Sequence, residues 1–313
     1  MEERPETSII IPVYNDRAKL EKCMESLYAQ TYPAGKVEVV VIDDGSDDGV
    51  ENWLSRRFPG VKFLRKERTG PDDSRNKGLQ IASGEMVGFI DSDCIADPDW
   101  IRVGISILSE NKYTIVTGRV IPGKRFIDKA MAILEFGEFL NDKSKDISNF
   151  VTCNLFARKE IFRDHPFPLS VWMGGDRLLS WKLHKLGWRI RYHAPMEVLH
   201  LPNLQYGDMV RRIKTYSLKT FQLRKVDPSL PGGKLLRLSI LAPPLLGGAR
   251  FLIDLKNLFK NRKSLDVRLT WIPLLIFSLF LTRTIGAVTM MRFLLKVSLK
   301  DKSNGKTSVT EIG

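Results

Sequence analysis

The chain has 313 residues, of which 27% are charged and 43% hydrophobic, and it carries a formal net charge of +13 with a pI of about 9.6. This length and composition fit a globular protein of two domains, or of one domain with an appendage, and the positive charge implies an anionic partner. Because the basic residues become dense after Arg211 and alternate there with long apolar runs, an anionic membrane surface is favoured and nucleic acid is disfavoured.

Cysteine usage and the first residues indicate the compartment. Cys23, Cys94 and Cys153 are odd in number and lack the spacing of a metal site, so we expect free thiols in a reducing environment. Residues 1–7 are mostly charged or polar and lack the apolar core of a signal peptide. We therefore expect the N-terminal domain to remain in the cytosol.

Strands and helices alternate along the first third of the chain. The runs Ser8–Val13, Glu38–Ile42 and Val61–Leu64 are predominantly apolar and rich in β-branched residues, and helical spacing of apolar residues separates them. This alternation predicts an α/β fold with a mostly parallel, Rossmann-like sheet that has helices on both faces. The first strand leads into Pro12–Asn15 instead of a glycine-rich turn, which argues against a dinucleotide-binding fold.

The apolar run Met86–Ile90 ends in Asp91, Ser92 and Asp93. A buried strand would bring these carboxylates to its C-terminal edge, where open α/β sheets bind ligands. Two carboxylates one residue apart suit a hard divalent cation that also takes oxygens from substrate phosphates. The alternative is that both residues cap the following turn. A phosphatase of the haloacid dehalogenase type also uses an Asp-x-Asp pair, but there the pair would follow the first strand.

Further elements follow in the second third of the chain. We expect helices over Pro98–Leu108 and Phe126–Leu140 and a strand over Tyr113–Val116. Leucines at helical spacing after Gly174 and Gly175 place Asp176 in the first turn of another helix, where the amide dipoles favour an ionised carboxylate that could serve as a general base. The alternative is a plain helix cap. An alternating run over residues 190–200 ends in His200.

A basic amphipathic helix is expected over Gln205–Lys225, and its arginines Arg211 and Arg212 are candidates for binding phosphate. A simple solvated helix is the alternative. Of the two apolar segments that follow, Leu238–Ala249 is short for a membrane span of ~20 residues. Trp271–Met291 is long enough, but Arg283 in its middle would cost about 2.5–3.5 kcal/mol on insertion.

The loop between these segments, Lys256–Arg268, is strongly basic. If the first segment crossed the bilayer, the loop would lie outside, against the positive-inside tendency. We therefore expect interfacial or re-entrant helices on the cytoplasmic face of the cell membrane, with a two-helix hairpin that spans the membrane as the alternative.

Five motifs in a fixed order give the chain a specific resemblance. They resemble the glycosyltransferases of family 2, which have the A-type glycosyltransferase fold, and the similarity is dense over the first third and thinner to about His200. The motifs are IIIPVYN at Ile9–Asn15, AQTYP at Ala29–Pro33, VVVIDDGSDDG at Val39–Gly49, RNKGLQIASGE at Arg75–Glu85 and FIDSDC at Phe89–Cys94.

The resemblance implies roles for residues at the nucleotide. Carboxylates suit the nucleoside because they accept hydrogen bonds from ring N–H and ribose hydroxyl groups, and cationic side chains suit the diphosphate. The implied nucleoside contacts are Pro12, Tyr14, Asp43 and Asp44, and the implied phosphate contacts are Arg75 and Lys77. Relatives usually carry small residues at Asp72 and Asp73, so the local field here is more acidic.

The resemblance also implies a metal site and a base. The implied ligands of Mg²⁺ or Mn²⁺ at the diphosphate are Asp93, Asp91 and His200. Asp91 is also an implied contact of the nucleotide. Asp176 matches the catalytic base of a Glu-Asp pair, in which Gly175 here replaces the glutamate. This difference suggests that the acceptor preference differs from that of the relatives.

The resulting hypothesis is an inverting glycosyltransferase that moves a sugar from a UDP- or GDP-type donor to a hydroxyl of a lipid-linked or cell-envelope glycan. The alternatives are transfer to a polyprenyl phosphate, which needs no base, and a non-catalytic, membrane-docked module that binds nucleotide sugars. The expected domains are 1–203 for catalysis (nucleotide half 1–111, acceptor half 112–203), 204–234 for the basic helix and linker, 235–298 for the hydrophobic helices and 299–313 for a polar tail.

Overall fold

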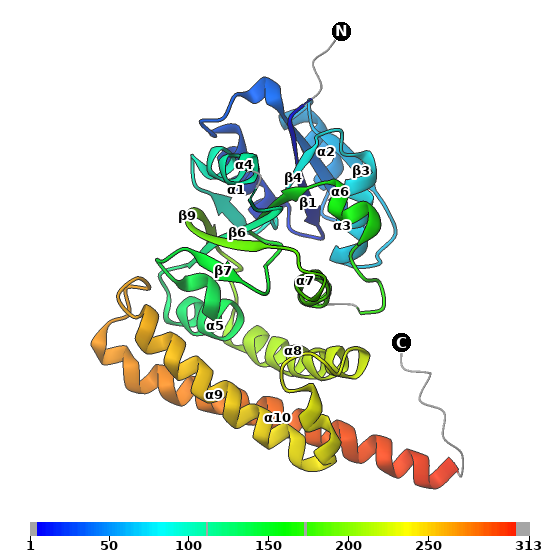
Figure 1. Ribbon diagram of the computed structural model, residues 1–313, viewed down its shortest axis with the longest axis vertical. Helices are drawn as coiled ribbons and strands as arrows, with labels where there is room; N and C mark the ends of the chain where they lie inside the picture. Colours follow the sequence, from blue (N-terminus) through cyan, green and yellow to red (C-terminus); the bar gives the residue numbers. More distant parts are fainter. Residues whose placement is uncertain (1–4, 111, 172–173, 305–313) are drawn as a thin grey trace. The chain divides into compact units, whose positions relative to one another are not determined.

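The computed structural model of the protein describes residues 5–110, 112–171 and 174–304 (Figure 1). Contacts divide the chain into two compact units. The first unit comprises residues 1–203 and 257–267, and the second comprises residues 204–256 and 268–313. The segment 257–267, which the sequence placed among the hydrophobic helices, therefore groups with the N-terminal residues.

The first unit is built on one mixed sheet. Among the described residues its strand order is β3-β2-β1-β4-β8-β6-β9-β5, with β7 also paired to β9. The strands are β1 Thr7–Val13, β2 Val37–Asp43, β3 Lys62–Arg65, β4 Met86–Phe89, β5 Cys94–Ala96, β6 Ile115–Pro122, β7 Lys145–Ile147, β8 Leu155–Arg158 and β9 Ile190–His200. Strands β1 to β4 are parallel to one another, as are β6 and β9. Strand β8 is antiparallel to β4 and β6, and β5 and β7 are antiparallel to β9.

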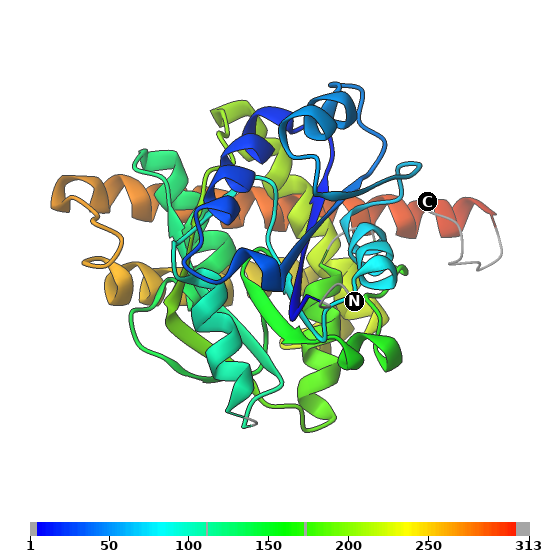
Figure 2. The ribbon, with the colours of Figure 1, turned by 90° about the horizontal axis from the view of Figure 1, so that it is seen from above.

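Helices cover both faces of this sheet (Figures 1 and 2). The side chains of Ile9 and Ile11 on β1 pack in a core with α1, α2 and α4, whereas Ile10 between them packs in a second core with α3, α6 and α7. The predicted α/β fold with helices on both faces is thus confirmed. The helices are α1 Arg17–Tyr28, α2 Val50–Arg57, α3 Pro71–Ile81, α4 Trp100–Ser109, α5 Phe126–Phe136, α6 Glu160–Asp164 and α7 Gly175–Lys185.

Strand β9 links the two halves of the unit. It pairs with β6 in two stretches separated by a register shift at Gly118 and Arg119. Beyond this bulge, β9 also pairs with β5, so that His200 lies opposite Cys94. Asn154 stabilises the bulge, because its Nδ2 donates to the backbone oxygens of Arg119 and Met196 at 2.9 and 3.0 Å. The bulge therefore sets where the last residues of β9 lie.

The second unit consists mainly of long helices. They are α8 Tyr206–Val226, α9 Ala242–Asn261, of which residues 242–256 belong to this unit, and α10 Ile272–Asn304, with 3₁₀ segments at Gly233–Leu241 and Leu269–Trp271. Arg283 on α10 forms a bidentate ion pair with Asp254 on α9, with Nε···Oδ2 and Nη2···Oδ1 distances of 2.6 and 2.9 Å. The sequence identified the costly arginine but not this partner.

Apolar side chains remain exposed on the helices of the second unit. On α9 they include Leu252 and Ile253, and on α10 Leu274, Phe277 and Phe280, each more than 40% exposed. Within the described residues, one stretch, Leu269–Lys296, is long and apolar enough to cross a membrane. Its presence is weak evidence for membrane association by itself.

The bulge yields a test of the fold. A Cβ added to Gly118 would lie 1.9 Å from the backbone oxygen of Met196 and 2.6 Å from Nδ2 of Asn154. Because a backbone atom cannot yield as a side chain does, we expect Gly118→Ala to destabilise the protein by about 3 kcal/mol, at the upper end of overpacking costs. Chemical denaturation measures this. Gly60→Ala, which meets nothing within 4 Å, is the matched control, and equal stability of the two variants would contradict the described bulge.

Candidate active site

The first strands bring several predicted residues to one edge of the sheet. Strands β2, β1 and β4 are adjacent and parallel, so the residues that follow them meet at their C-terminal ends. Pro12 lies in β1 opposite Ile42 of β2. Tyr14 follows β1 and is 37% exposed, and the guanidinium of Arg68 lies 3.9 Å from the centroid of its ring.

The two aspartates at the end of β2 differ in their environments. Asp43 is fully buried, and its Oδ1 accepts a hydrogen bond from the Ser46 backbone at 2.9 Å, while Oδ2 has no hydrogen-bond partner and lies 3.7 Å from Nη1 of Arg65. Asp44 accepts hydrogen bonds from the backbone N–H groups of Thr69 and Gly70 at 2.9 Å, and it also pairs with Lys66. Asp43 thus keeps an acceptor oxygen for a ligand, whereas Asp44 holds the loop before α3.

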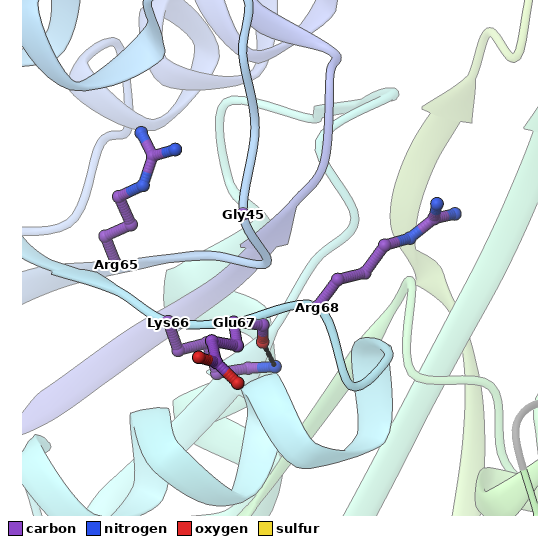
Figure 3. Close-up of a pocket in the computed structure, with 5 residues that line it drawn as sticks. All are labelled: Gly45, Arg65, Lys66, Glu67 and Arg68. Atoms are coloured by element: carbon purple, nitrogen blue, oxygen red, sulfur yellow. Dashed lines mark hydrogen bonds between the residues drawn. The ribbon is translucent and has the colours of Figure 1, made fainter.

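An open hollow of about 500 Å³ adjoins these aspartates. It is lined by Gly45 and by residues 65–68, which include three basic side chains (Figure 3). Gly45 has a φ of +83°, and a Cβ there would lie 3.3 Å from the backbone oxygen of Lys66. Glycine therefore allows the turn after β2 to approach the loop after β3. Arg65 and Arg68 lie outside the five sequence motifs, so no sequence signal marks them as candidates.

Arg75 on α3 lies at the centre of a buried charge cluster. Its Nη1 donates to Oδ1 of Asp72 at 2.9 Å and its Nη2 to Oδ1 of Asp91 at 2.8 Å. Arg75 is 6% exposed and Asp72 is 4% exposed, and burial raises the pKa of the Asp72 carboxyl although Arg75 opposes this rise. Since Nη1 and Nη2 each donate to a carboxylate, Arg75 holds Asp91 in place. A direct contact of Arg75 or Lys77 with phosphate stays a prediction.

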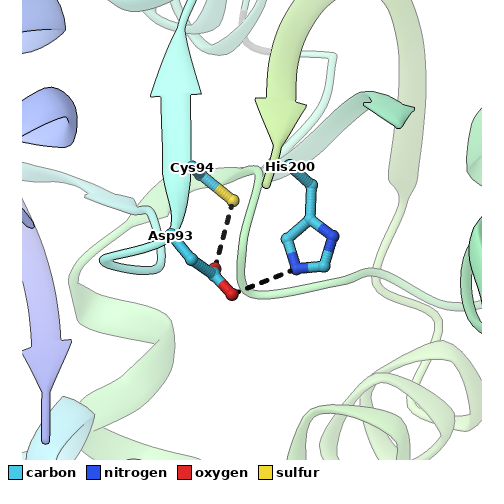
Figure 4. Close-up of side chains that lie close together, drawn as sticks. All are labelled: Asp93, Cys94 and His200. Carbon is cyan, nitrogen blue, oxygen red and sulfur yellow. Dashed lines mark hydrogen bonds and ion pairs between the residues drawn. The ribbon is translucent and has the colours of Figure 1, made fainter. Parts of the chain in front are cut away.

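Asp93 directly precedes β5 and lies near His200, the last residue of the neighbouring strand β9. Nε2 of His200 lies 3.4 Å from Oδ2 of Asp93, and these groups and Sγ of Cys94 offer ligand atoms within 4.8 Å of one another (Figure 4). The carboxylate and the imidazole fit Mn²⁺ or Mg²⁺, which prefer hard ligands. Burial raises the pKa of the Cys94 thiol well above its usual value, so this group stays protonated and is a poor ligand.

Asp176 lies in the first turn of α7, as the sequence predicts. Its Oδ1 accepts a hydrogen bond from the backbone N–H of Arg177 at 2.8 Å. Burial and the neighbouring charge of Asp72 raise the pKa of the Asp176 carboxyl from 3.8 to about 6, so this carboxylate is more basic than an ordinary aspartate. Desolvation outweighs the helix dipole here.

Hydrogen bonds link the candidate catalytic carboxylates. Arg75 donates to Asp91 and to Asp72, and Asp72 also accepts from the backbone N–H of Gly175, the residue before Asp176. These contacts bring the metal-site candidate Asp91 and the candidate base to one region of the first unit. Arg211 and Arg212 lie on α8 of the second unit, where Arg211 pairs with Asp208 at 3.6 Å. Their approach to the nucleotide stays a prediction.

Comparison with known proteins places this site in a family. The model of glycosyl transferase family 2 matches residues 8–165, about half of the chain. The glycosyltransferase AglE of Haloferax volcanii is 29% identical over 239 residues, which cover 71% of this chain and 78% of the relative.

Two solved structures share the fold. A mannosyltransferase of Pyrobaculum calidifontis in complex with GDP-Man and Mn²⁺ matches with a TM-score of 0.56 and 21% identity, over 97% of this chain and 89% of that chain. GalNAc-T7 with UDP, GalNAc and Mn²⁺ matches with a TM-score of 0.52 and 17% identity, over 66% of this chain and 46% of that chain. Family model, relatives and fold agree, and the chain is therefore a glycosyltransferase of family 2.

Proposed function

We propose that this glycosyltransferase transfers a sugar from a nucleoside diphosphate donor to a hydroxyl acceptor with inversion at the anomeric carbon. The observation that carries the proposal is the set of hydrogen bonds through Arg75 and Asp72, which connects Asp91 to Gly175, the residue before Asp176. At one end of these contacts, Asp91 and the nearby Asp93 suit a cation and a diphosphate, and at the other end Asp176 offers a base. Donors of the UDP and GDP type are supported by the two solved structures, whose ligands are GDP-Man and UDP.

The nucleoside is proposed to bind at the ends of β1 and β2. Asp43 supports this placement because its Oδ2 is buried and has no hydrogen-bond partner, a costly state that a donor group of the base or ribose would relieve. Tyr14 and Arg68 offer a flat cationic surface beside the hollow. Lys66, by contrast, is held by Asp44 and by Asp73 at 3.2 Å.

The diphosphate is proposed to bind near Asp91 and Asp93. Asp93 and His200 would hold Mn²⁺ or Mg²⁺, with Asp91 oriented by Arg75. When bound, the cation supplies positive charge that stabilises the leaving nucleotide. Arg75 fixes the position of the Asp91 carboxylate through a hydrogen bond of 2.8 Å.

Asp176 is proposed to act as the base. Its carboxylate takes the proton of the acceptor hydroxyl while that oxygen forms a bond to the anomeric carbon and the bond to the phosphate oxygen breaks on the opposite face. The electron pair of the broken bond leaves with the nucleoside diphosphate. A carboxyl with a pKa of about 6 is a stronger base than an ordinary aspartate and is still ionised at neutral pH.

The acceptor is proposed to be a lipid-linked or cell-envelope glycan, reached from the cytoplasmic face of the membrane. The support is the set of apolar side chains exposed on α9 and α10 and the excess of basic residues in the C-terminal third. Asp254 forms an ion pair with Arg283 and neutralises its charge. This pairing lowers the free-energy cost of placing Arg283 among apolar side chains. Interfacial helices on an anionic surface fit these features.

Asp176→Asn tests the base. We expect turnover to fall about 10²–10⁴-fold because proton transfer to a base is lost, while binding of the donor persists. In the unchanged enzyme, turnover should fall about tenfold per pH unit below about 6, where Asp176 becomes protonated. Release of nucleoside diphosphate over a pH series measures both effects. Full turnover by the variant would instead favour an anionic acceptor such as a polyprenyl phosphate.

Stability provides the folding control for this variant. The folded-state pKa of Asp176 lies above its ordinary value of 3.8, so ionisation destabilises the folded protein above pH 6 and has no such effect below pH 4. Without added metal, Asp176→Asn should therefore be more stable than the unchanged protein by about 1–2 kcal/mol at pH 7.5, after allowance for partial solvent screening. This gain should disappear near pH 4.

Asp93→Asn and His200→Ala test the metal site. Mn²⁺ together with GDP or UDP should raise the melting temperature of the unchanged protein, because a ligand at 100 times its Kd stabilises the folded state by about 2.7 kcal/mol. Each variant should lose most of this rise. Asp99→Asn, which alters an exposed carboxylate at the start of α4, is the control. A full Mn²⁺-dependent rise in both site variants would remove Asp93 and His200 from the metal site.

Membrane association is tested by flotation with vesicles. Binding should be stronger to vesicles with 30% phosphatidylglycerol than to pure phosphatidylcholine, and the double variant Leu252→Glu/Phe277→Glu should reduce it at least tenfold by removing exposed apolar contacts. Leu186→Glu, at an exposed apolar position of the first unit, should bind normally. Resistance of the bound protein to alkaline carbonate extraction would contradict an interfacial position and support spanning helices.

A further inference from the structure

Asp72 is a buried carboxylate that no step of the proposed reaction uses. It is the second residue of α3 and is 4% exposed. A carboxylate in such a place is tolerated only when its oxygens are bonded. One oxygen, Oδ1, accepts from Nη1 of Arg75 at 2.9 Å, and the other, Oδ2, accepts from the backbone N–H of Gly175 at 3.2 Å.

The second of these bonds caps helix α7 from another helix. The first backbone N–H groups of a helix have no partner within it, and a side chain at the N-cap position usually accepts one of them. The N-cap of α7 is Gly174, which has no side chain and a φ of +84°. Asp72 supplies the missing acceptor from α3, although it lies 103 residues away in the sequence.

Asp72 also explains why residue 175 is glycine. A Cβ added there would lie 2.2 Å from Oδ2 and 2.8 Å from Cγ of Asp72. Any side chain on residue 175 would thus enter the volume that the Asp72 carboxylate occupies. Side chains on residues 72 and 175 would occupy the same volume, and in this chain the side chain of Asp72 occupies it.

The residues next to this volume have roles in the proposed reaction. Gly175 directly precedes Asp176, so the bond from Asp72 fixes the backbone that carries the proposed base. The guanidinium of Arg75 interacts with the carboxylates of Asp72, Asp91 and Asp176. Removing Asp72 would therefore release the first turn of α7 and leave Arg75 with a different balance of charges.

We propose that Asp72 is a positioning residue for sugar transfer, and that a carboxylate in the volume between residues 72 and 175 is required whichever of the two residues carries it. This inference rests on the proposed function of Asp176. Asp72 acts through α7 and Arg75 and does not touch the substrate. Its loss should lower kcat while KM for the donor changes little, because the nucleoside contacts lie at β1 and β2.

The experiment relocates the carboxylate. Four variants are compared with the unchanged protein: Asp72→Ala, Gly175→Asp, Asp72→Ala/Gly175→Asp and Asp72→Ala/Gly175→Ala. Melting temperature and the release of GDP or UDP from GDP-mannose, UDP-glucose and UDP-N-acetylglucosamine with Mn²⁺ are measured for each. The variant with two alanines is the matched control, because it fills the volume without a charge.

We expect Asp72→Ala to lower kcat at least tenfold with KM for the donor within about threefold. Gly175→Asp alone should lower both kcat and the melting temperature because two side chains then compete for one volume. The relocated carboxylate of Asp72→Ala/Gly175→Asp should recover kcat to within about threefold of the unchanged protein. The control with two alanines should not recover kcat, even if its melting temperature is normal.

Three results would overturn the proposal. The first is an unchanged kcat in Asp72→Ala. The second is a fold-loss of kcat in Asp72→Ala/Gly175→Asp that equals the product of the losses in the two single variants. The third is equal recovery of kcat by Asp72→Ala/Gly175→Ala. The first result, together with an inactive Asp176→Asn, would leave the proposed function standing without a role for Asp72. An active Asp176→Asn would reject the proposed base instead, so the two failures are distinguishable. An unchanged protein without turnover of any of the three donors would count against both.

Discussion

The buried guanidinium of Arg75 is the charge on which the site depends. Desolvating such a group costs several kcal/mol unless carboxylates surround it in good geometry, and Asp72 and Asp91 meet this need at 2.9 and 2.8 Å. These contacts join helix α3 to the loop after β4, and through Asp72 to the start of α7. Satisfying one cation thus fixes three segments that are distant in the sequence, and the proposed base lies on the last of them.

The acidic residues at this sheet edge form two groups, which differ in whether their carboxylate oxygens are fully hydrogen-bonded within the protein. Asp44 and Asp72 have theirs bonded within the protein and hold loops and helix ends. Asp43 keeps a buried oxygen without a hydrogen bond and would gain from a donor group of a ligand, whereas Asp176 has a raised pKa and would gain from a proton. Sequence position alone does not separate these groups, because all four lie at the end of a strand or near the start of a helix.

The sequence predicted what depends on local pattern. The strand predicted over Ser8–Val13 occurs as β1, Thr7–Val13, because a continuous β-branched run has few other stable states. The leucines after Asp176 place it correctly in a first helical turn. Contacts between distant segments could not be predicted in this way. The bond from Asp72 to Gly175 is one such case. The raised pKa of Asp176 is another, because burial and the nearby charge of Asp72 exist only in the folded chain.

The ion pair between Asp254 and Arg283 has a consequence for the history of this chain. Loss of either residue would leave the other as an isolated charge among apolar helices, a state far less favourable than having both or neither. Homologues should therefore either keep both residues or replace both, most easily with two apolar side chains. Homologues that keep an aspartate at one position and a leucine at the other should be rare.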